Sequence, residues 1–187
     1  MSVEELVDAV SEQDVPTGEK VTVPAAHDRY LPHRIVAVLI FKPSGKLLVQ
    51  VHAHHGRRLD HSVGGHVSAG ETYAQAAQRE MQEELNLDVS LTKIAESVMS
   101  REYYSKSGDK NIHIFGVFIG QVEEDWQLKQ TEEVDEIREM TVEEIVEAMN
   151  ARPDDFLQGF MTSLATYLKS INSRLKINAY DKNWGEL

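Results

Sequence analysis

Three glutamates near the middle of the chain have the type and spacing to do chemistry. Glu80, Glu83 and Glu84 lie three and four positions apart, so an α-helix would place Glu80 beside both of the others. Like charges at this spacing weaken a helix, and a divalent cation such as Mg²⁺ would offset their repulsion because hard cations take oxygen ligands. Magnesium also shares its coordination shell with substrate phosphates. The alternative is a solvated acidic face, which is common in an acidic protein.

A helix over Glu71 to Asn86 is predicted to carry these carboxylates. The loop before it ends in Gly64 and Gly65. Apolar residues at helical spacing predict the face that packs on the core. They are Ala74, Ala77, Met81 and Leu85. The helix therefore buries one side and presents the glutamates beside it.

The remaining patterns mix strands and helices. Residues 1–30 form a polar lead-in with one short strand at 21–23, a hairpin is expected over 34–51, and 52–66 reads as loop. Further strands are expected at 89–104, 112–122 and 134–140, with a helix capped by Thr141 and another over about 154–171. Together they predict an α/β fold in which helices cover a mixed β-sheet.

Composition narrows the function. The 187 residues suit one domain, and the absence of cysteine excludes a thiol nucleophile, a Cys-ligated zinc site and disulfides. A formal charge of −12 disfavours binding of nucleic-acid polymers or anionic membranes. The N-terminus has no secretory signal pattern, and the longest apolar run, Ile35 to Phe41, is far shorter than a membrane span. We therefore expect a cytoplasmic protein.

The sequence around the glutamates resembles the Nudix box. That pattern is Gly, five residues, Glu, seven residues, Arg-Glu, an apolar residue, any residue, Glu-Glu, any residue, Gly and an apolar residue. The matching residues are Gly65, Glu71, Arg79, Glu80, Met81, Glu83, Glu84 and Leu87. Asn86 stands where the family has Gly, and Asn is the next best residue for a left-handed helix end.

The resemblance implies a Nudix fold, in which a mixed β-sheet is sandwiched between α-helices. It places the domain at residues 31–172, with 1–30 as an N-terminal extension packing on it and 173–187 as a polar tail. It also implies a hydrolase that uses Mg²⁺ (or Mn²⁺) to cleave a diphosphate linkage by attack of water on phosphorus. The substrate would be a nucleoside diphosphate or one of its derivatives.

Roles for the box residues follow from the resemblance. Glu80, Glu83 and Glu84 are the implied metal ligands, and the carbonyl of Gly65 is a further one, with Glu80 and Glu83 also named as catalytic. Residues that would lock the loop onto the helix are Gly65, Glu71 and Arg79. Glu133 is our choice for a general base outside the box, with Glu132 and Glu136 as alternatives. The alternative for Glu132, Glu133 and Glu136, each taken singly, is that it is a surface acid in an acidic linker.

Residues outside the box resemble the isopentenyl-diphosphate isomerase-like branch, notably 31–34, 46–50 and 62–67. The isomerase needs a cysteine at the position of Gly65, so the chain resembles a hydrolase on that scaffold. Hydrolysis of isoprenoid-type diphosphates and a catalytically silent nucleotide-binding module stay open as alternatives. The sequence names no surface for a homodimer, although a dimer is plausible.

Basic and imidazole side chains complete the candidate site. Arg34, His66 and Arg101 are the candidates for substrate contact. His33 and His66 match positions where the isomerase binds a second metal, and ordinary hydrogen bonding in the loops is the other possibility. A separate histidine cluster has no known zinc-binding spacing, although imidazole is a common zinc ligand. It comprises His52, His54, His55 and His61.

Overall fold

The computed structural model describes residues 5–52, 56–104, 109–128, 134 and 136–178. Nine strands form one mixed sheet in this part of the chain. The strands are β1 (Leu6–Val10), β2 (Pro16–Thr22), β3 (His33–Phe41), β4 (Leu47–His52), β5 (Arg58–Asp60), β6 (Val63–His66), β7 (Thr92–Tyr104), β8 (Asp109–Gln121) and β9 (Ile137–Met140). The helices are α1 (Val23–Asp28), α2 (Tyr73–Leu85), α3 (Val142–Ala151) and α4 (Gln158–Ser170), with a 3₁₀ turn at Pro153–Asp155.

Strand β3 organises the sheet. It runs parallel to β8 from the His33–His113 pair to the Phe41–Gln121 pair, and antiparallel to β6, where Ile35 lies opposite His66. β8 continues into β7 as a long antiparallel pair, and β4 pairs with β5 and β9. β3 is apolar along nearly all its length, which suits a central strand whose side chains are buried on both faces of the sheet.

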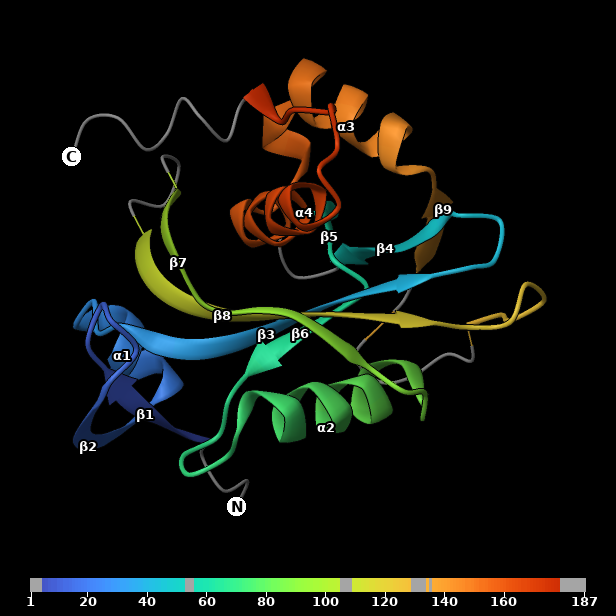
Figure 1. Cartoon of the computed structure of the whole chain (residues 1–187). Helices are drawn as coiled ribbons and strands as arrows, with labels where there is room; N and C mark the ends of the chain where they lie inside the picture. Colours follow the sequence, from blue (N-terminus) through green and yellow to red (C-terminus); the bar gives the residue numbers. More distant parts are fainter. Residues whose placement is uncertain (1–4, 53–55, 105–108, 129–133, 135, 179–187) are drawn as a thin grey trace.

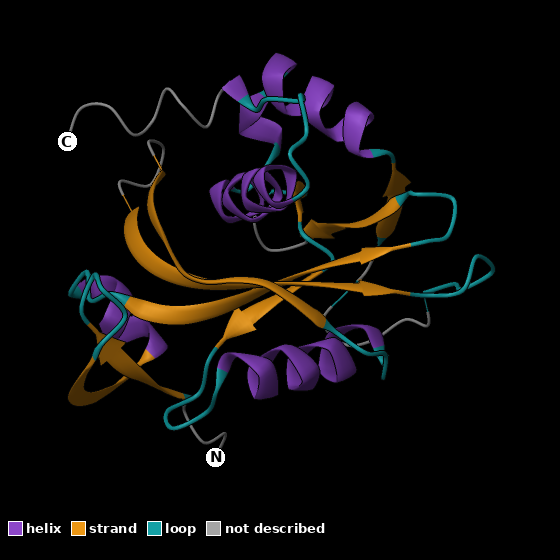
Figure 2. Cartoon of the chain, viewed as in Figure 1, coloured by secondary structure: helices purple, strands orange, loops and turns teal. Residues whose placement is uncertain are grey.

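Helices cover both faces of the sheet, as Figures 1 and 2 show, with α2 on one side and α3 and α4 on the other. The α2 side packs Met81 and Leu85 against Val36, Val38 and other strand residues. The opposite layer holds a second core that includes Phe160 and Leu164 of α4. Each such fully buried side chain contributes about 1.5–3 kcal/mol relative to exposure. The expected fold, a mixed sheet sandwiched between helices, is confirmed.

Local capping signals fix the ends of α2. Thr72 accepts a hydrogen bond from the backbone N–H of Gln75, whose side chain bonds back to the Thr72 N–H. At the other end Asn86 has φ 50° and ψ 40°, the left-handed conformation expected from its place in the box. Thr141 caps α3 in the same reciprocal way through Glu144, as predicted.

Several sequence predictions need correction. The lead-in holds two strands and a helix instead of one short strand at 21–23, because the exposed β2 is polar and shows no apolar alternation. The region 52–66 contains β5 and β6. The two strands of the 34–51 hairpin pair only at Phe41–Leu47 and then diverge to other partners. Finally, α4 begins at Gln158, after the 3₁₀ turn.

The packing face of α2 is also rotated from the predicted one. Ala74 is exposed, whereas Tyr73 and Ala76 are buried. The cause is Gly116 of β8: a Cβ there would lie 2.5 Å from Cδ1 of Tyr73, so the missing side chain leaves room for the tyrosine ring. Two of the box glutamates, Glu80 and Glu84, are thereby brought to the buried side of the helix.

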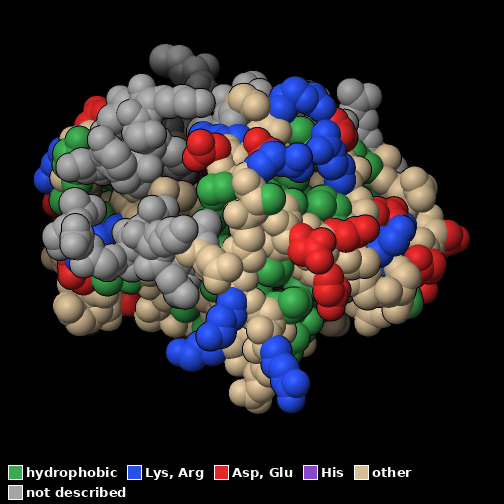
Figure 3. Space-filling view, turned by 90° about the horizontal axis from the view of Figure 1, so that it is seen from above, with side chains coloured by type: hydrophobic (Ala, Val, Ile, Leu, Met, Phe, Trp, Pro, Cys, Tyr) green, Lys and Arg blue, Asp and Glu red, His purple; other side chains and the backbone are tan. Residues whose placement is uncertain are grey.

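Charged side chains are interspersed on the surface that lies on the side of α3. In the space-filling view of this side, Lys and Arg border groups of Asp and Glu, with hydrophobic side chains exposed between them (Figure 3). No histidine is visible on this face of the described residues. The net negative charge is therefore not concentrated into one uniformly acidic surface here.

Candidate functional site

Arg79 joins the loop after β6 to α2. Its Nε and Nη2 donate to the two carboxylate oxygens of Glu71 at 3.1 and 3.0 Å, a paired geometry that guanidinium groups favour. Nη2 also donates to the carbonyl of His66 at 3.0 Å, and Glu71 accepts from the backbone N–H of Ser68. The predicted lock between Glu71 and Arg79 is therefore present, and it fixes the loop against the helix.

The same guanidinium reaches two of the box glutamates. Arg79 Nη1 donates to Glu80 at 2.8 Å and to Glu83 at 3.1 Å. The Glu83 side chain is 48% exposed, whereas that of Glu80 is 9% exposed. Glu83 is thus positioned by Arg79 while it still faces solvent, from which a substrate would arrive.

Gly65 of β6 is the point where the backbone meets the glutamates. A Cβ at this position would lie 2.1 Å from the carboxyl carbon and Oε1 of Glu80. No larger residue fits unless the carboxylate moves. The glycine of the box is therefore required by the contact between strand and helix, and it brings the peptide group of β6 beside a buried carboxylate.

Burial changes the protonation of two of the glutamates. Desolvation raises the pKa of Glu80 to about 7, although Arg79 opposes the change. Burial and the nearby Glu80 raise the pKa of Glu84 well above its usual range, while a 2.9 Å hydrogen bond from Gln50 opposes it. The raised pKa values favour the neutral carboxyls, and a divalent cation bound beside them would favour the ionised form. Carboxylate oxygens are the ligand type that suits Mg²⁺ or Mn²⁺.

The candidate substrate contacts lie in different settings. Arg34 donates from Nε to Asp14 at 2.6 Å and lies over the ring of Tyr73. Arg101 pairs with Glu12. Both arginines are thus engaged by the turn between β1 and β2, and their contact with substrate stays a prediction.

The general-base candidates are only partly described. Glu132 and Glu133 lie outside the described residues, so the choice of Glu133 stays a prediction. Glu136 forms ion pairs with Arg57 and Arg138. These arginines lower the pKa of its carboxyl, the hydrogen bond from Arg138 being the main cause.

The histidines fall into two settings. His33 and His66 meet His27 and His113, neither of which the sequence analysis had linked to them, and the four offer ligand atoms within 4.8 Å of one another. Strand register brings them together, and a single sequence does not reveal that register. His61 packs near Phe160 beside Asp60 and, like His52, lies outside this group. His54 and His55 lie outside the described residues.

Fold and site together define a class of protein: a mixed sheet between helices, with an arginine-locked helix that presents clustered carboxylates to a glycine of the neighbouring strand. Comparison with known families agrees. The model of the NUDIX domain matches residues 31–160, and the chain therefore belongs to the NUDIX family. This match confirms the family resemblance inferred from the box.

Relatives place the chain within that family. An uncharacterized Nudix hydrolase, all7351, of Nostoc is 37% identical over 91 residues, which are 46% of this chain, and the match spans about half (54%) of that relative. A Nudix hydrolase of Yersinia pestis is 29% identical over 91% of this chain and 89% of its own length. An isopentenyl-diphosphate Delta-isomerase of Pectobacterium atrosepticum is also 29% identical, over 83% and 87%.

Solved structures support the same fold. The dihydroneopterin triphosphate pyrophosphohydrolase of Escherichia coli superposes with a TM-score of 0.56 at 19% identity, covering 75% of this chain and 96% of the other. At this identity the likeness concerns the fold alone. Among the described residues, no helix is long and apolar enough to cross a membrane.

Proposed function

We propose that this protein is a divalent-metal-dependent hydrolase that cleaves the diphosphate linkage of a nucleoside diphosphate or a derivative of one. The single observation that carries the proposal is the contact of Gly65 with Glu80, beside the equally buried Glu84. Such a site brings carboxylate oxygens together where a metal–diphosphate complex would bind. The cation is Mg²⁺ or Mn²⁺, and the reducing cytosol suits a chain without cysteine.

Each box residue has a role that follows from its surroundings. Glu80, Glu83, Glu84 and the Gly65 carbonyl would hold the cation. When bound, the cation supplies electrostatic stabilisation of the charge that spreads over the phosphoryl group during attack by water.

The chain's own residues prepare that step. Arg79 holds Glu83 towards solvent and Glu80 towards β6. Burial raises the pKa of Glu80 to about 7, and a bound cation would favour its ionised form. Glu133 is the proposed general base that takes the proton of the attacking water.

Gly65 also argues against isomerase chemistry. The box carboxylates are all present, and the cysteine that the isomerase resemblance requires at this position is absent. The isomerase relative nevertheless makes isoprenoid-type diphosphates a second substrate class to be tested. A catalytically silent binding module would bind nucleotides without turnover.

A substrate panel tests the proposal. Release of phosphate and nucleoside monophosphate is measured with nucleoside diphosphates and triphosphates, sugar nucleotides and prenyl diphosphates, with Mg²⁺, Mn²⁺ or excess chelator. We expect metal-dependent hydrolysis of a nucleotide, lost with chelator and lowered by about 100-fold or more in Glu83→Gln. Glu147→Gln is the matched control, because Glu147 is exposed on α3 and the substitution removes the same charge. Undiminished rates in chelator, or binding without turnover across the panel, would refute it.

A further inference from the structure

The N-terminal hairpin, formed by β1 and β2, lies beside the loop that leads into the box helix (Figure 1). This box loop comprises residues 67–72, between β6 and α2. β1 pairs with β3 at Ala9 and His33, and at Val7 it forms an antiparallel bridge to Ser68 of the box loop. Oγ of Ser68 also donates to Glu5 at 3.0 Å. The hairpin therefore contacts the box loop as well as the sheet.

Two hydrogen bonds from the box loop to β1 fix the loop just before the box glutamate Glu71. The backbone N–H of Ala69 donates to the carbonyl of Leu6 at 2.7 Å. The next N–H, that of Gly70, donates to the carboxylate of Asp8, also at 2.7 Å. Gly70 has φ 87°, a left-handed conformation that other residues resist. Asp8 thus holds the peptide at which the chain turns towards the helix.

The box loop connects this contact to the clustered carboxylates. The backbone N–H of Ser68 donates to the carboxylate of Glu71 at 3.1 Å. That carboxylate accepts two hydrogen bonds from Arg79, whose Nη1 donates to Glu80 and to Glu83. The position of the box loop therefore affects the arginine that orients two of the glutamates.

The turn of the hairpin holds the first residue of α2. Asp14 lies in this turn, and its side chain is 8% exposed. Its carboxylate accepts from Oη of Tyr73 at 3.0 Å, from Nε of Arg34 at 2.6 Å and from Oγ of Ser97 at 2.6 Å. Tyr73 begins α2, and its ring occupies the space beside Gly116. The hairpin thus contacts the box helix at the loop before it and at its first residue.

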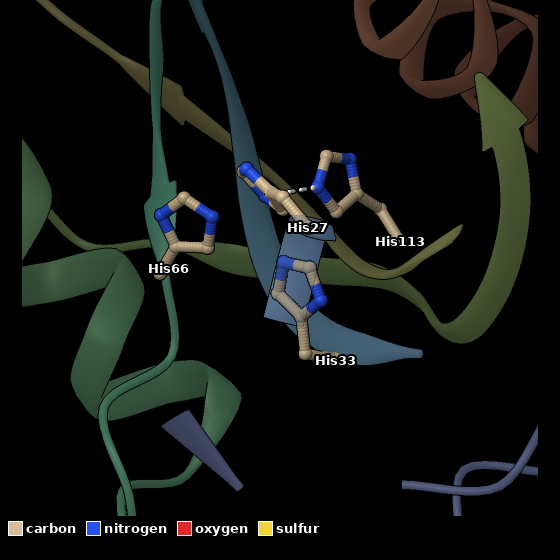
Figure 4. A group of neighbouring side chains, drawn as sticks. All are labelled: His27, His33, His66 and His113. Carbon is tan, nitrogen blue, oxygen red and sulfur yellow. Dashed lines mark hydrogen bonds between the residues drawn. The ribbon is translucent and has the colours of Figure 1, made fainter. Parts of the chain in front are cut away.

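Other contacts attach the N-terminal segment to the sheet. Val7, Val21 and Ala26 form a small buried core between the hairpin and α1. His27 of α1 lies among the three other histidines that Figure 4 labels, at ring-centroid distances of 5.0–5.6 Å. These contacts do not involve Asp8, so a substitution of Asp8 is expected to release the box loop while the segment stays folded on the sheet.

We propose that Asp8 is a positioning residue for the box: by holding Gly70 it keeps the box loop, and through Glu71 and Arg79 the glutamates, in the arrangement that binds a metal–diphosphate complex. A loop that is already ordered loses less conformational freedom when the complex binds. A displacement of about 1 Å in a catalytic group lowers turnover by about 100-fold, so a distant contact of this kind affects the rate. The inference rests on the proposed hydrolase function.

Two substitutions of Asp8 test this role in the full chain. Asp8→Ala removes the acceptor, and it is expected to lower kcat by about 10- to 100-fold at saturating Mn²⁺, with a smaller change in KM. Asp8→Asn keeps an acceptor oxygen without the charge and is expected to stay within about 5-fold of the wild type. Asp28→Ala is the matched control, because Asp28 is exposed on α1 of the same segment and the substitution removes the same charge.

Two further measurements do not depend on turnover. Mn²⁺ affinity, measured by electron paramagnetic resonance without substrate, is expected to fall by about 10-fold in Asp8→Ala. Amide hydrogen exchange of the metal-free protein is expected to be about 10-fold faster at residues 69–71 in this variant and unchanged in α4. Wild-type protein that turns over no substrate would refute the hydrolase proposal alone, and Mn²⁺ affinity and loop exchange would then decide the role of Asp8.

Two results would overturn this inference. The first is Asp8→Ala with the kcat and Mn²⁺ affinity of the wild type, whatever its Tm, which would mean that the contact serves stability alone. The second is an equal loss in Asp8→Ala and Asp8→Asn, which would assign the effect to charge instead of the hydrogen bond to Gly70. If Asp8→Ala does not fold, Asp8→Val takes its place, because a β-branched residue favours the strand and also lacks the acceptor.

Discussion

The buried carboxyl of Glu80 makes a quantitative prediction about stability. Burial raises its pKa from 4.5 to about 7, so between these pH values the folded chain binds a proton that the unfolded chain releases. The free energy of unfolding of the metal-free protein therefore falls as pH rises through this window. With about 1.4 kcal/mol for each pKa unit, the contribution of Glu80 falls by about 2–3 kcal/mol between about pH 5 and pH 8.

Other groups titrate in the same range, so the assay must isolate Glu80. The lowered pKa values of His33 and His66 have the opposite effect, since they stabilise the folded state as pH rises towards 6.5. Denaturant unfolding is measured in chelator at both pH values for the wild type, Glu80→Gln and the exposed control Glu147→Gln. The fall specific to Glu80 is the difference between the first two proteins, and the control is expected to behave as the wild type.

Magnesium provides the second half of this test. A cation bound to Glu80 favours its ionised form, so Mg²⁺ is expected to reduce the fall in the wild type and to have little effect in Glu80→Gln. If wild type and Glu80→Gln lose the same free energy between the two pH values, the carboxyl is not desolvated as described. An Mg²⁺ effect of equal size in both proteins would separately refute Glu80 as a ligand.

Three further substitutions follow from contacts described above. Gly65→Ala forces a Cβ into the Glu80 carboxylate and is expected to cost about 1–3 kcal/mol in denaturant unfolding and to lower turnover, whereas an unchanged rate would contradict the contact. Asn86→Gly is expected to leave Tm nearly unchanged, and Asn86→Val to cost about 1–2 kcal/mol because a β-branched residue resists the left-handed conformation. Asp14→Ala removes the acceptor of Arg34, Tyr73 and Ser97 and is expected to cost about 3 kcal/mol by chemical unfolding, while a cost below about 1 kcal/mol would show that this network contributes little.

The box helix was predictable because its signals are local. Asn86 at the end of α2 and Thr141 at the start of α3 act within a few residues of the chain, and both caps are present as expected. The family and the sandwich of helices and sheet followed from the box. Ala74 was placed on the wrong side because the rotation of α2 depends on Gly116, a residue of a distant strand.

Features that depend on strand pairing could not be predicted from the sequence. β2 was missed because its residues 16–20 are all exposed, so no apolar alternation marks it and only its pairing with β1 makes it a strand. The histidine group needed the register between β3 and β8 before His113 could be placed beside His33. Pairing of this kind depends on tertiary contacts, whereas helix caps depend on residues that are neighbours in the sequence.

The parallel pairing of β3 with β8 also has a kinetic consequence. His33 pairs with His113, and every later pair along these strands joins positions equally far apart in the chain. During synthesis β3 therefore leaves the ribosome long before its principal neighbour exists, with an apolar strand edge open to other chains. Contacts this distant slow folding, so the nascent N-terminal half is the stage at which chaperones would protect the protein from aggregation.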